Sequence, residues 1–183
     1  ARFASYNVIW VLSGEYNEAY DTGTTPADWT HHGEVLKAAD PYDHPISVHP
    51  SGRGSSREFG YTDWMDFVFQ QWPIGFHTNI KNDYKYDKPV VNGEYAYAGW
   101  HESENVRIGA WEIYTAGGSF TAGFFNTFAP DKGGWDMDSY QQEQNWVKWS
   151  YEFMDRTEWW DMSPRDDLVT DETVHCLADP GDE

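Results

Sequence analysis

The chain has 183 residues, enough for one domain with a sizeable core, and 31 acidic against 12 basic residues give it a formal net charge of −19. A phosphate backbone needs a basic surface, so this charge excludes nucleic acid as a partner, and an anionic membrane surface is equally disfavoured. No apolar run reaches the length of about 18 residues that a membrane-spanning helix needs, and the lone Cys176 leaves neither a disulfide framework nor a zinc cluster within this segment, so we predict no membrane insertion, metal site or cofactor.

Short apolar segments alternate with helical patterns along the chain. A helix begins where Thr25 caps the first turn and Pro26 opens it, and it ends before Asp40-Pro41. Pro73 ends the third strand, and Gly117-Gly118 ends the third helix. The five predicted strands span 8–12, 46–49, 67–72, 89–94 and 119–126. The predicted helices span 25–39, part of 74–88, 105–114 and 139–155.

This alternation predicts βα units, and apolar strands that are covered on both faces predict a parallel sheet. A doubly wound sheet fits the same pattern, but no Gly-rich phosphate loop follows any strand, which favours a barrel. A complete (β/α)8 barrel needs roughly 250 residues. The predicted fold class is therefore α/β, a partial TIM (β/α)8 barrel of the C-terminal five βα units over 1–160, with 161–183 as a linker towards another domain.

Both ends of the sequence are expected to be internal to a longer protein. The first residue is Ala1 rather than Met, and the last residues include the turn-like Pro180-Gly181. The acidic composition fits equally a high-salt habitat and an extracellular enzyme that its charge keeps soluble. Localisation therefore stays unknown, with the extracellular space or the periplasm favoured.

Two glutamates follow predicted strands at the edge where barrel enzymes carry their active sites. Glu15 comes after the first strand and Glu94 ends the fourth, each directly preceded by Gly. A retaining glycoside hydrolase needs two carboxylates about 5–5.5 Å apart, one as nucleophile and one as general acid and then base. The alternative is a structural ion pair of either glutamate with a neighbouring arginine such as Arg107.

Further polar and aromatic residues end the strands or follow the glutamates, where a sugar would meet them. Aromatic residues make up 18% of the chain, and their flat faces fill cores or stack on sugar rings. His49 and Trp72 have structural alternatives, as a satisfied histidine and as plain packing. The adjacent His31-His32 does not form a metal pair, because neighbours on a helix do not share a face. The predicted substrate-binding residues are Tyr16, Asn17, His49, Gln71, Trp72, Tyr95 and Tyr97.

Four segments together resemble the apiosidase-like glycoside hydrolases, namely 8–17, 43–49, 88–95 and 107–123. That family is similar to a large clan of retaining barrel glycosidases with catalytic residues on strands four and seven. The resemblance implies that the visible strands are four to eight, that Glu94 is the nucleophile and that Glu15 is the acid/base, with Glu18 as a substitute. It also implies that 176–181 begins a β-sandwich often labelled collagen-binding. After the last strand, the segment 124–127 differs from the family's Tyr-Gly pattern.

The sequence thus predicts a retaining glycoside hydrolase that acts on a polysaccharide or its side-chain sugars by double displacement. The expected partner is a carbohydrate substrate, and the oligomeric state is not predicted. Two alternatives from other classes stay open: a non-catalytic carbohydrate-binding barrel protein, and a collagen-interacting module. The isolated chain is expected to be an open, inactive barrel with two exposed sheet edges.

Overall fold

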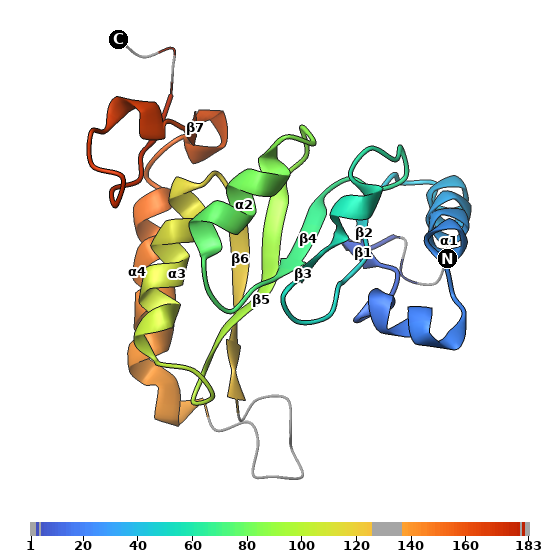
Figure 1. Ribbon diagram of the computed structural model, residues 1–183, viewed down its shortest axis with the longest axis horizontal. Helices are drawn as coiled ribbons and strands as arrows, with labels where there is room; N and C mark the ends of the chain where they lie inside the picture. The colour runs from blue at the N-terminus through green and yellow to red at the C-terminus, as the bar shows by residue number, and fades with distance from the viewer. Residues whose placement is uncertain (1–2, 4, 126–136, 180, 182–183) are drawn as a thin grey trace. The chain divides into compact units, whose positions relative to one another are not determined.

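The computed structural model describes residues 3, 5–125, 137–179 and 181 (Figure 1). The chain forms two compact units. The first unit comprises 1–71 and 83–91, and the second comprises 72–82 and 92–183. Secondary structure mixes helices and strands, so the α/β class is confirmed. No helix among the described residues has the length and apolar character that a membrane crossing requires.

The first unit begins with two short parallel strands, β1 (Trp10–Val11) and β2 (Ile46–Ser47), in which Trp10 pairs with Ile46. Helix α1 (Pro26–Ala39) connects them. Its start is fixed as predicted, because the backbone N–H and the hydroxyl of Thr25 both donate to the carboxylate of Asp28. The unit also contains the 3₁₀ helices η1 (Tyr16–Thr22) and η2 (Ser56–Phe59) and the strands β3 (Gly54–Ser55) and β4 (Val68–Gln71).

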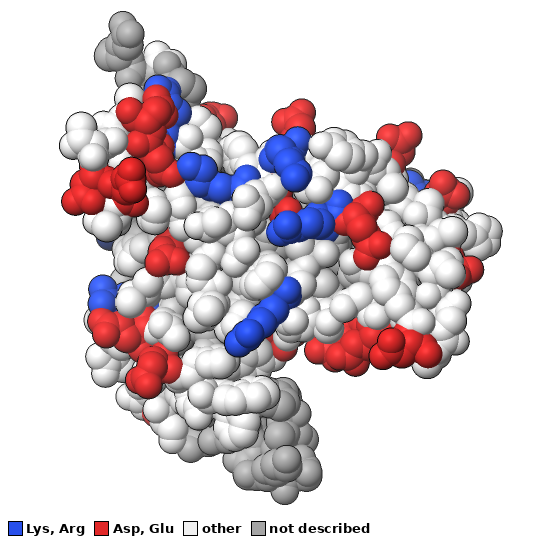
Figure 2. Space-filling model, in the orientation of Figure 1, with Lys and Arg blue, Asp and Glu red and all other residues white. Residues whose placement is uncertain are grey.

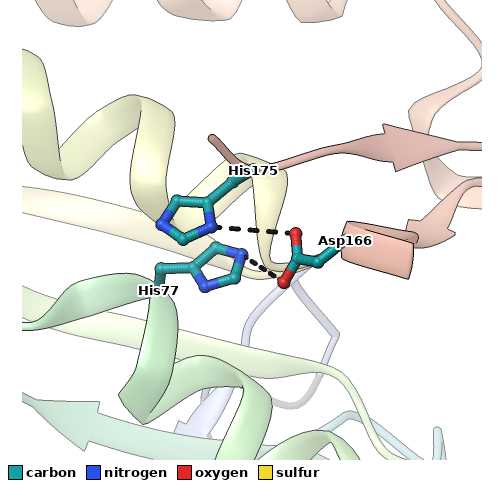
Figure 3. Close-up of side chains that lie close together, drawn as sticks. All are labelled: His77, Asp166 and His175. Carbon is teal, nitrogen blue, oxygen red and sulfur yellow. Dashed lines mark ion pairs between the residues drawn. The ribbon is translucent and has the colours of Figure 1, made fainter. Parts of the chain in front are cut away.

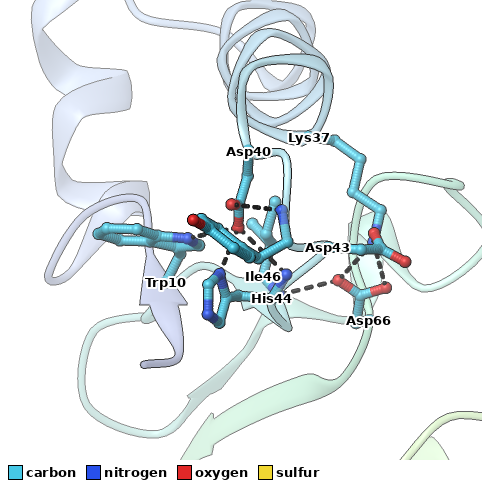
Figure 4. A network of polar contacts seen from close by, with 8 residues as sticks. Trp10, Lys37, Asp40, Asp43, His44, Ile46 and Asp66 are labelled. Carbon is cyan, nitrogen blue, oxygen red and sulfur yellow. Dashed lines mark hydrogen bonds and ion pairs between the residues drawn. The ribbon is translucent and has the colours of Figure 1, made fainter. Parts of the chain in front are cut away.

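A polar network ties the end of α1 to both parallel strands (Figure 4). Asp40 accepts hydrogen bonds from the Trp10 indole at 2.9 Å and from the ring and backbone nitrogens of His44 at 2.7 and 3.1 Å. Asp66 accepts from the backbone N–H of Ile46 at 2.8 Å and pairs with Lys37 at 2.9 Å. These contacts hold β1 and β2 in place, because each carboxylate bonds a strand and its neighbouring segment at the same time.

The second unit is built around β5 and β6, with helices α3 and α4 lying side by side (Figure 1). The Trp111 ring of α3 meets the Phe153 ring of α4 edge to face, with centroids 5.4 Å apart. Gly109 lets α3 approach β5, because a Cβ there would lie 2.6 Å from the Tyr95 ring. The helices of this unit are α2 (Phe76–Tyr84), whose last two residues belong to the first unit, α3 (Glu104–Thr115) and α4 (Gln141–Met154). The strands are β5 (Val90–Ala98), β6 (Ser119–Phe124), β7 (Ser163–Pro164) and β8 (Leu177–Ala178). The short 3₁₀ helices are η5 (Asp138–Tyr140), η6 (Trp159–Asp161) and η7 (Asp166–Leu168).

All five predicted strands and all four predicted helices are present, but the strands do not form one parallel sheet. Within the described part of the chain, β1 and β2 form a separate two-stranded sheet, and a four-stranded sheet has the order β3-β4-β5-β6, with β5 beginning in the first unit and continuing in the second. The unpredicted β3 runs antiparallel to β4, with Gly54 opposite Gln71. Its Gly-Ser sequence carries no apolar pattern, so periodicity does not reveal it.

Two further details correct the sequence predictions. The first strand is not covered on both faces, since Ile9 and Val11 are 62% and 43% exposed. The fourth strand does not end at Glu94 but continues to Ala98, because Tyr95 and Tyr97 extend its β-forming sequence. For the fifth strand, Asn126 and Thr127 lie outside the described residues, and the described part ends at Phe124 in β6.

Candidate active site

In the first unit, Glu15 lies at the turn from β1 into η1. Its backbone is left-handed, with φ 51° and ψ 45°, and its side chain is exposed. The chain here lies against the end of β2, because the backbone N–H of His49 donates to Ser13 at 3.1 Å and that of Tyr16 donates to His49 at 2.9 Å. The ends of two adjacent parallel strands therefore bring Glu15 and His49 into one local region.

Tyr16 lies in the core of the first unit. Its side chain is 2% exposed, and its hydroxyl donates to the Glu58 carboxylate at 2.5 Å, as the hydroxyl of Tyr20 does at 2.8 Å. Burial, followed by the Glu58 carboxylate, raises the pKa of both tyrosines, so both hydroxyls remain donors. Tyr16 thus anchors the segment that follows Glu15 and is not among the substrate contacts that we propose.

Asn17, His49 and Gln71 occupy half-buried positions in the first unit. The Asn17 side chain donates to the Ser51 hydroxyl at 2.6 Å and accepts from the Ser51 backbone at 2.7 Å, which fixes the segment that follows His49. The His49 ring packs on Phe69, with centroids 4.7 Å apart. The side-chain oxygen of Gln71 is buried without a hydrogen-bond partner among the described residues, so it remains available as an acceptor.

One buried charged group of the first unit escapes sequence reasoning. Asp83 is fully buried and accepts from Gln70 and from the Ser55 hydroxyl, the latter at 2.6 Å, while Arg57 pairs with it at 3.0 Å. Asp83 thus links β3 to β4 through hydrogen bonds to side chains that are far apart in sequence. Because Asp83 lies in a polar helical stretch, no local pattern distinguishes it from a solvent-exposed aspartate.

In the second unit, Glu94 is half-buried within β5, and the Tyr97 hydroxyl donates to its carboxylate. The backbone directly after Glu94 is unusual, with positive φ values of 69° at Ala96 and 41° at Tyr97. Such strained backbone is found where a functional side chain must be held in a particular direction. Gly123 on β6 makes room for the Tyr97 ring, since a Cβ there would lie 3.1 Å from it.

Trp72 is held by its backbone in the same unit. Its N–H donates to the side chain of buried Asn92 at 3.3 Å, and its carbonyl accepts from the same side chain at 3.0 Å. The Trp72 indole N–H is buried without a hydrogen-bond partner among the residues that the structure covers. Asn92 therefore positions Trp72, a role that its place in the predicted strand 89–94 does not reveal.

Tyr95 points into the core of the second unit. It is fully buried, its hydroxyl donates to the backbone carbonyl of Val106 at 2.9 Å, and its ring meets Phe76 and Phe120 edge to face. Burial raises the pKa of this hydroxyl, which keeps it protonated. Its contacts give Tyr95 a packing role, so it is left out of the substrate contacts that we propose.

An exposed aromatic group follows β5 and was not selected from the sequence. Trp100 is 65% exposed, and its ring lies edge to face with Tyr97 at 6.1 Å and with Phe125 at 5.8 Å. Its backbone N–H donates to the carbonyl of Tyr97 at 2.9 Å. Trp100 thus joins the Glu94–Tyr97 pair to a flat apolar surface suited to a sugar ring. The available signal was a tryptophan just beyond a strand that carries a candidate catalytic carboxylate.

The arginine named in the structural alternative pairs with a different glutamate. Arg107 pairs with Glu104, one turn earlier on the exposed side of α3. Such a pair between exposed side chains contributes little to stability.

Comparison with known proteins places the chain in a family. Residues 1–161 match the apiosidase-like catalytic domain. The chain belongs to the apiosidase-like family. Comparison of this apiosidase-like chain with curated proteins gives no significant match.

Solved structures agree on the fold. A structure named as a glycoside hydrolase is similar over 93% of this chain and 48% of its own, with a TM-score of 0.72 and 21% identity. A glycoside hydrolase of family 5 from Bacteroides vulgatus is similar over 80% of this chain and 41% of its own, with a TM-score of 0.62 and 18% identity. The apiosidase-like chain thus spans less than half the length of these two structures and shares their fold.

Proposed function

We propose that the apiosidase-like chain is the part of a retaining glycoside hydrolase that carries both catalytic carboxylates, with Glu94 as nucleophile and Glu15 as general acid/base. The observation that carries the proposal is the hydrogen bond from Tyr97 to Glu94 in a half-buried position of β5. A phenol donor on a carboxylate is a charge-assisted hydrogen bond, which fixes the attacking oxygen in direction. Family membership and fold support the same reaction class.

The proposed reaction proceeds in two displacements. The Glu94 carboxylate attacks the anomeric carbon, the glycosidic C–O bond breaks, and Glu15 gives its proton to the leaving oxygen. Water then attacks the same carbon, Glu15 takes a proton from it, and the Glu94–sugar ester is cleaved. One water is consumed, the sugar is released with retained configuration, and Glu15 ends protonated as it began.

The substrate contacts that we propose are polar and aromatic side chains of both units. Asn17, His49 and Gln71 offer polar atoms in the first unit, and Trp72 and Trp100 offer aromatic surface in the second unit. Tyr97 contributes through Glu94 rather than as a sugar contact. Together these residues suit a polysaccharide or its side-chain sugars.

The finer architecture belongs to the same proposal. The strand–helix alternation, the parallel β1–β2 pair and the likeness to a family 5 hydrolase support a partial (β/α)8 barrel over 1–160. The family match over 1–161 supports a boundary there, with 161–183 leading into a β-sandwich domain.

The test compares single variants of the full-length enzyme that contains this chain, on a glycan panel that identifies a substrate. Glu94→Gln removes the nucleophile with little change in volume, so turnover falls by orders of magnitude while circular dichroism stays unchanged. Glu104→Gln is the matched control, since it removes an exposed glutamate of the same unit, and it retains full turnover. Full turnover by Glu94→Gln would rule out the assignment.

The separation of the two carboxyl groups distinguishes this enzyme from a carbohydrate-binding protein without activity. A crystal structure with bound sugar should give about 5–5.5 Å between Glu15 and Glu94, and a value beyond about 9.5 Å fits neither hydrolytic mechanism. Tight glycan binding without hydrolysis by the unmodified enzyme would favour the binding protein.

A further inference from the structure

Two histidines and an aspartate lie close together in the second unit, although no sequence motif links them. His77 comes from α2, Asp166 from η7, and His175 from the segment before β8 (Figure 3). One ligand atom of each lies within 4.8 Å of the others. The His77 Nε2 atom is 3.5 Å from one oxygen of Asp166, and the His175 Nδ1 atom is 3.7 Å from the other.

His77 is the least accessible member of this group. Its side chain is 6% exposed, and its Nε2 atom has no hydrogen-bond partner among the described residues, because the Asp166 oxygen lies too far away. A buried polar atom that points at a carboxylate without bonding it calls for a further partner. Burial, reinforced by the neighbouring His175, lowers the pKa of His77 to about 4, so the ring is neutral at pH 7.

We propose that His77, Asp166 and His175 bind a divalent transition-metal ion, zinc in the first place, that fastens the segment 166–175 to helix α2. Two imidazoles and a carboxylate are ligands that zinc accepts, with bonds of about 2.0–2.2 Å. Tetrahedral coordination at these bond lengths separates ligand atoms by roughly 3.3 Å. The nitrogen–oxygen distances of 3.5 and 3.7 Å are close to that value, so small side-chain movements complete the site.

The surroundings leave room for a fourth ligand. A pocket of about 230 Å³ adjoins the group and is lined by Asp166 and His175 themselves, by Asp171 and Glu172, and by Val169, Thr170 and Val174. Acidic side chains gather over the C-terminal segment (Figure 2) and attract a cation. Water from this pocket can therefore fill the open coordination position.

Two features of the group must change when the ion binds. The rings of His77 and His175 are stacked 3.3 Å apart with an interplanar angle of 9°, so each must rotate for both nitrogens to face one point. The Lys81 ammonium now pairs with Asp166 at 2.5 Å, and it must swing away because it competes for the same oxygen. Lys81 is 41% exposed, so solvent is open to it.

The ion has no part in the proposed hydrolysis, which needs only Glu15, Glu94 and water, so the two proposals fail independently.

The absence of a metal site from the sequence-based prediction has a simple reason. His77 and His175 are separated by almost a hundred positions, and the usual ligand spacings consider only near neighbours.

The test titrates the metal-free full chain with Zn²⁺ by calorimetry and follows thermal unfolding. We expect one ion per chain, and at a hundredfold excess over Kd a rise in Tm of roughly 5–10 °C. Mg²⁺ should cause no rise, because it prefers oxygen ligands. X-ray absorption at the zinc edge should show two imidazole nitrogens. Lack of saturable Zn²⁺ binding would overturn the proposal.

Three variants locate the site. His175→Ala should weaken Zn²⁺ binding at least tenfold, whereas the control His31→Ala, an exposed histidine of α1, should bind as the unmodified chain does. Lys81→Met should strengthen Zn²⁺ binding, because it removes the positive charge that competes for Asp166. Lys81 is 41% exposed, so this substitution leaves the core unchanged. Equal binding by all three variants, or loss of binding in His31→Ala alone, would contradict the assignment.

Discussion

The two glutamates that define the proposed site occupy contrasting environments. Glu94 is half-buried within β5 and bonded to Tyr97, whereas Glu15 is exposed in a left-handed turn, and its carboxylate has no hydrogen-bond partner among the described residues. A nucleophile must be oriented before it attacks, while an acid/base must lose and regain a proton in each cycle. The fixed glutamate suits the first role and the accessible glutamate the second.

The largest expected effect distinguishes the nucleophile from the acid/base by comparing substrates that have different leaving groups. Glu94→Gln should abolish turnover on every glycoside, because no other group forms the covalent intermediate. Glu15→Gln should cost about 10²–10⁴-fold on a natural sugar and much less in the first step on an aryl glycoside, whose leaving oxygen needs no proton. Initial rates on both substrate types measure this. Equal losses for Glu15→Gln on both would refute the acid role.

The hydrogen bond to Glu94 supplies the next largest effect. Tyr97→Phe should lower kcat roughly tenfold or more with little change in KM, because a hydrogen bond to a charged group contributes about 1.5–3 kcal/mol and this one acts on the nucleophile. The matched control is Tyr20→Phe, which removes a hydroxyl from Glu58 in the first unit at a residue outside the proposed catalytic and substrate contacts. It should reduce the free energy of unfolding and leave kcat nearly unchanged at a temperature where the enzyme is folded. A larger kcat loss in the control would contradict the comparison.

A smaller effect comes from the room that Gly123 leaves for the Tyr97 ring. Gly123→Ala introduces a Cβ about 3.1 Å from that ring, so the phenol must shift and its bond to Glu94 must lengthen. We expect a several-fold decrease in kcat, which should be absent when the same change is made in the Tyr97→Phe background. If Gly123→Ala lowers kcat by the same factor in the Tyr97→Phe background, the glycine affects kcat without Tyr97.

The smallest effect concerns the stability of the first unit and how that stability depends on pH. Burial alone would raise the pKa of Asp40, but donors from Trp10, His44 and Tyr42 outweigh it and hold that pKa well below the ordinary value. The folded state thus resists protonation, so this stabilisation is present above about pH 4 and is lost as the pH falls below it. Urea unfolding should show Asp40→Asn less stable than the unmodified chain at pH 7, with the gap narrowing at pH 3. The exposed control Asp21→Asn should show no gap at either pH.

Local patterns predicted most of the fold, and long-range pairing accounts for what they missed. Apolar runs and the Thr25-Pro26 start gave the strands and α1 because those signals lie within a few residues. The Gly-Ser strand β3 lacks such a signal, and its antiparallel pairing depends on β4 and buried Asp83. Because β3 is missing from the predicted strands, the sequence pattern could not show that β4 has an antiparallel partner.

The candidate site shows the same division. Tyr97 was selected because it lies three residues after Glu94, and in the structure its hydroxyl donates to that glutamate. Tyr16 and Tyr95 carried the same signal, an aromatic residue beside a glutamate, yet both turn inwards to Glu58 and Val106. Which way such a side chain points is decided by partners far along the chain, and neither composition nor spacing contains that information.

The most direct test of the central claim is to trap the covalent intermediate. The full-length enzyme is incubated with a 2-deoxy-2-fluoro glycoside of its substrate sugar, which slows the second displacement more than the first, and the peptides are weighed by mass spectrometry. The account predicts one added glycosyl mass on the peptide that contains Glu94 and none in Glu94→Gln. An adduct on another residue, or a product of inverted configuration with no adduct, would contradict it.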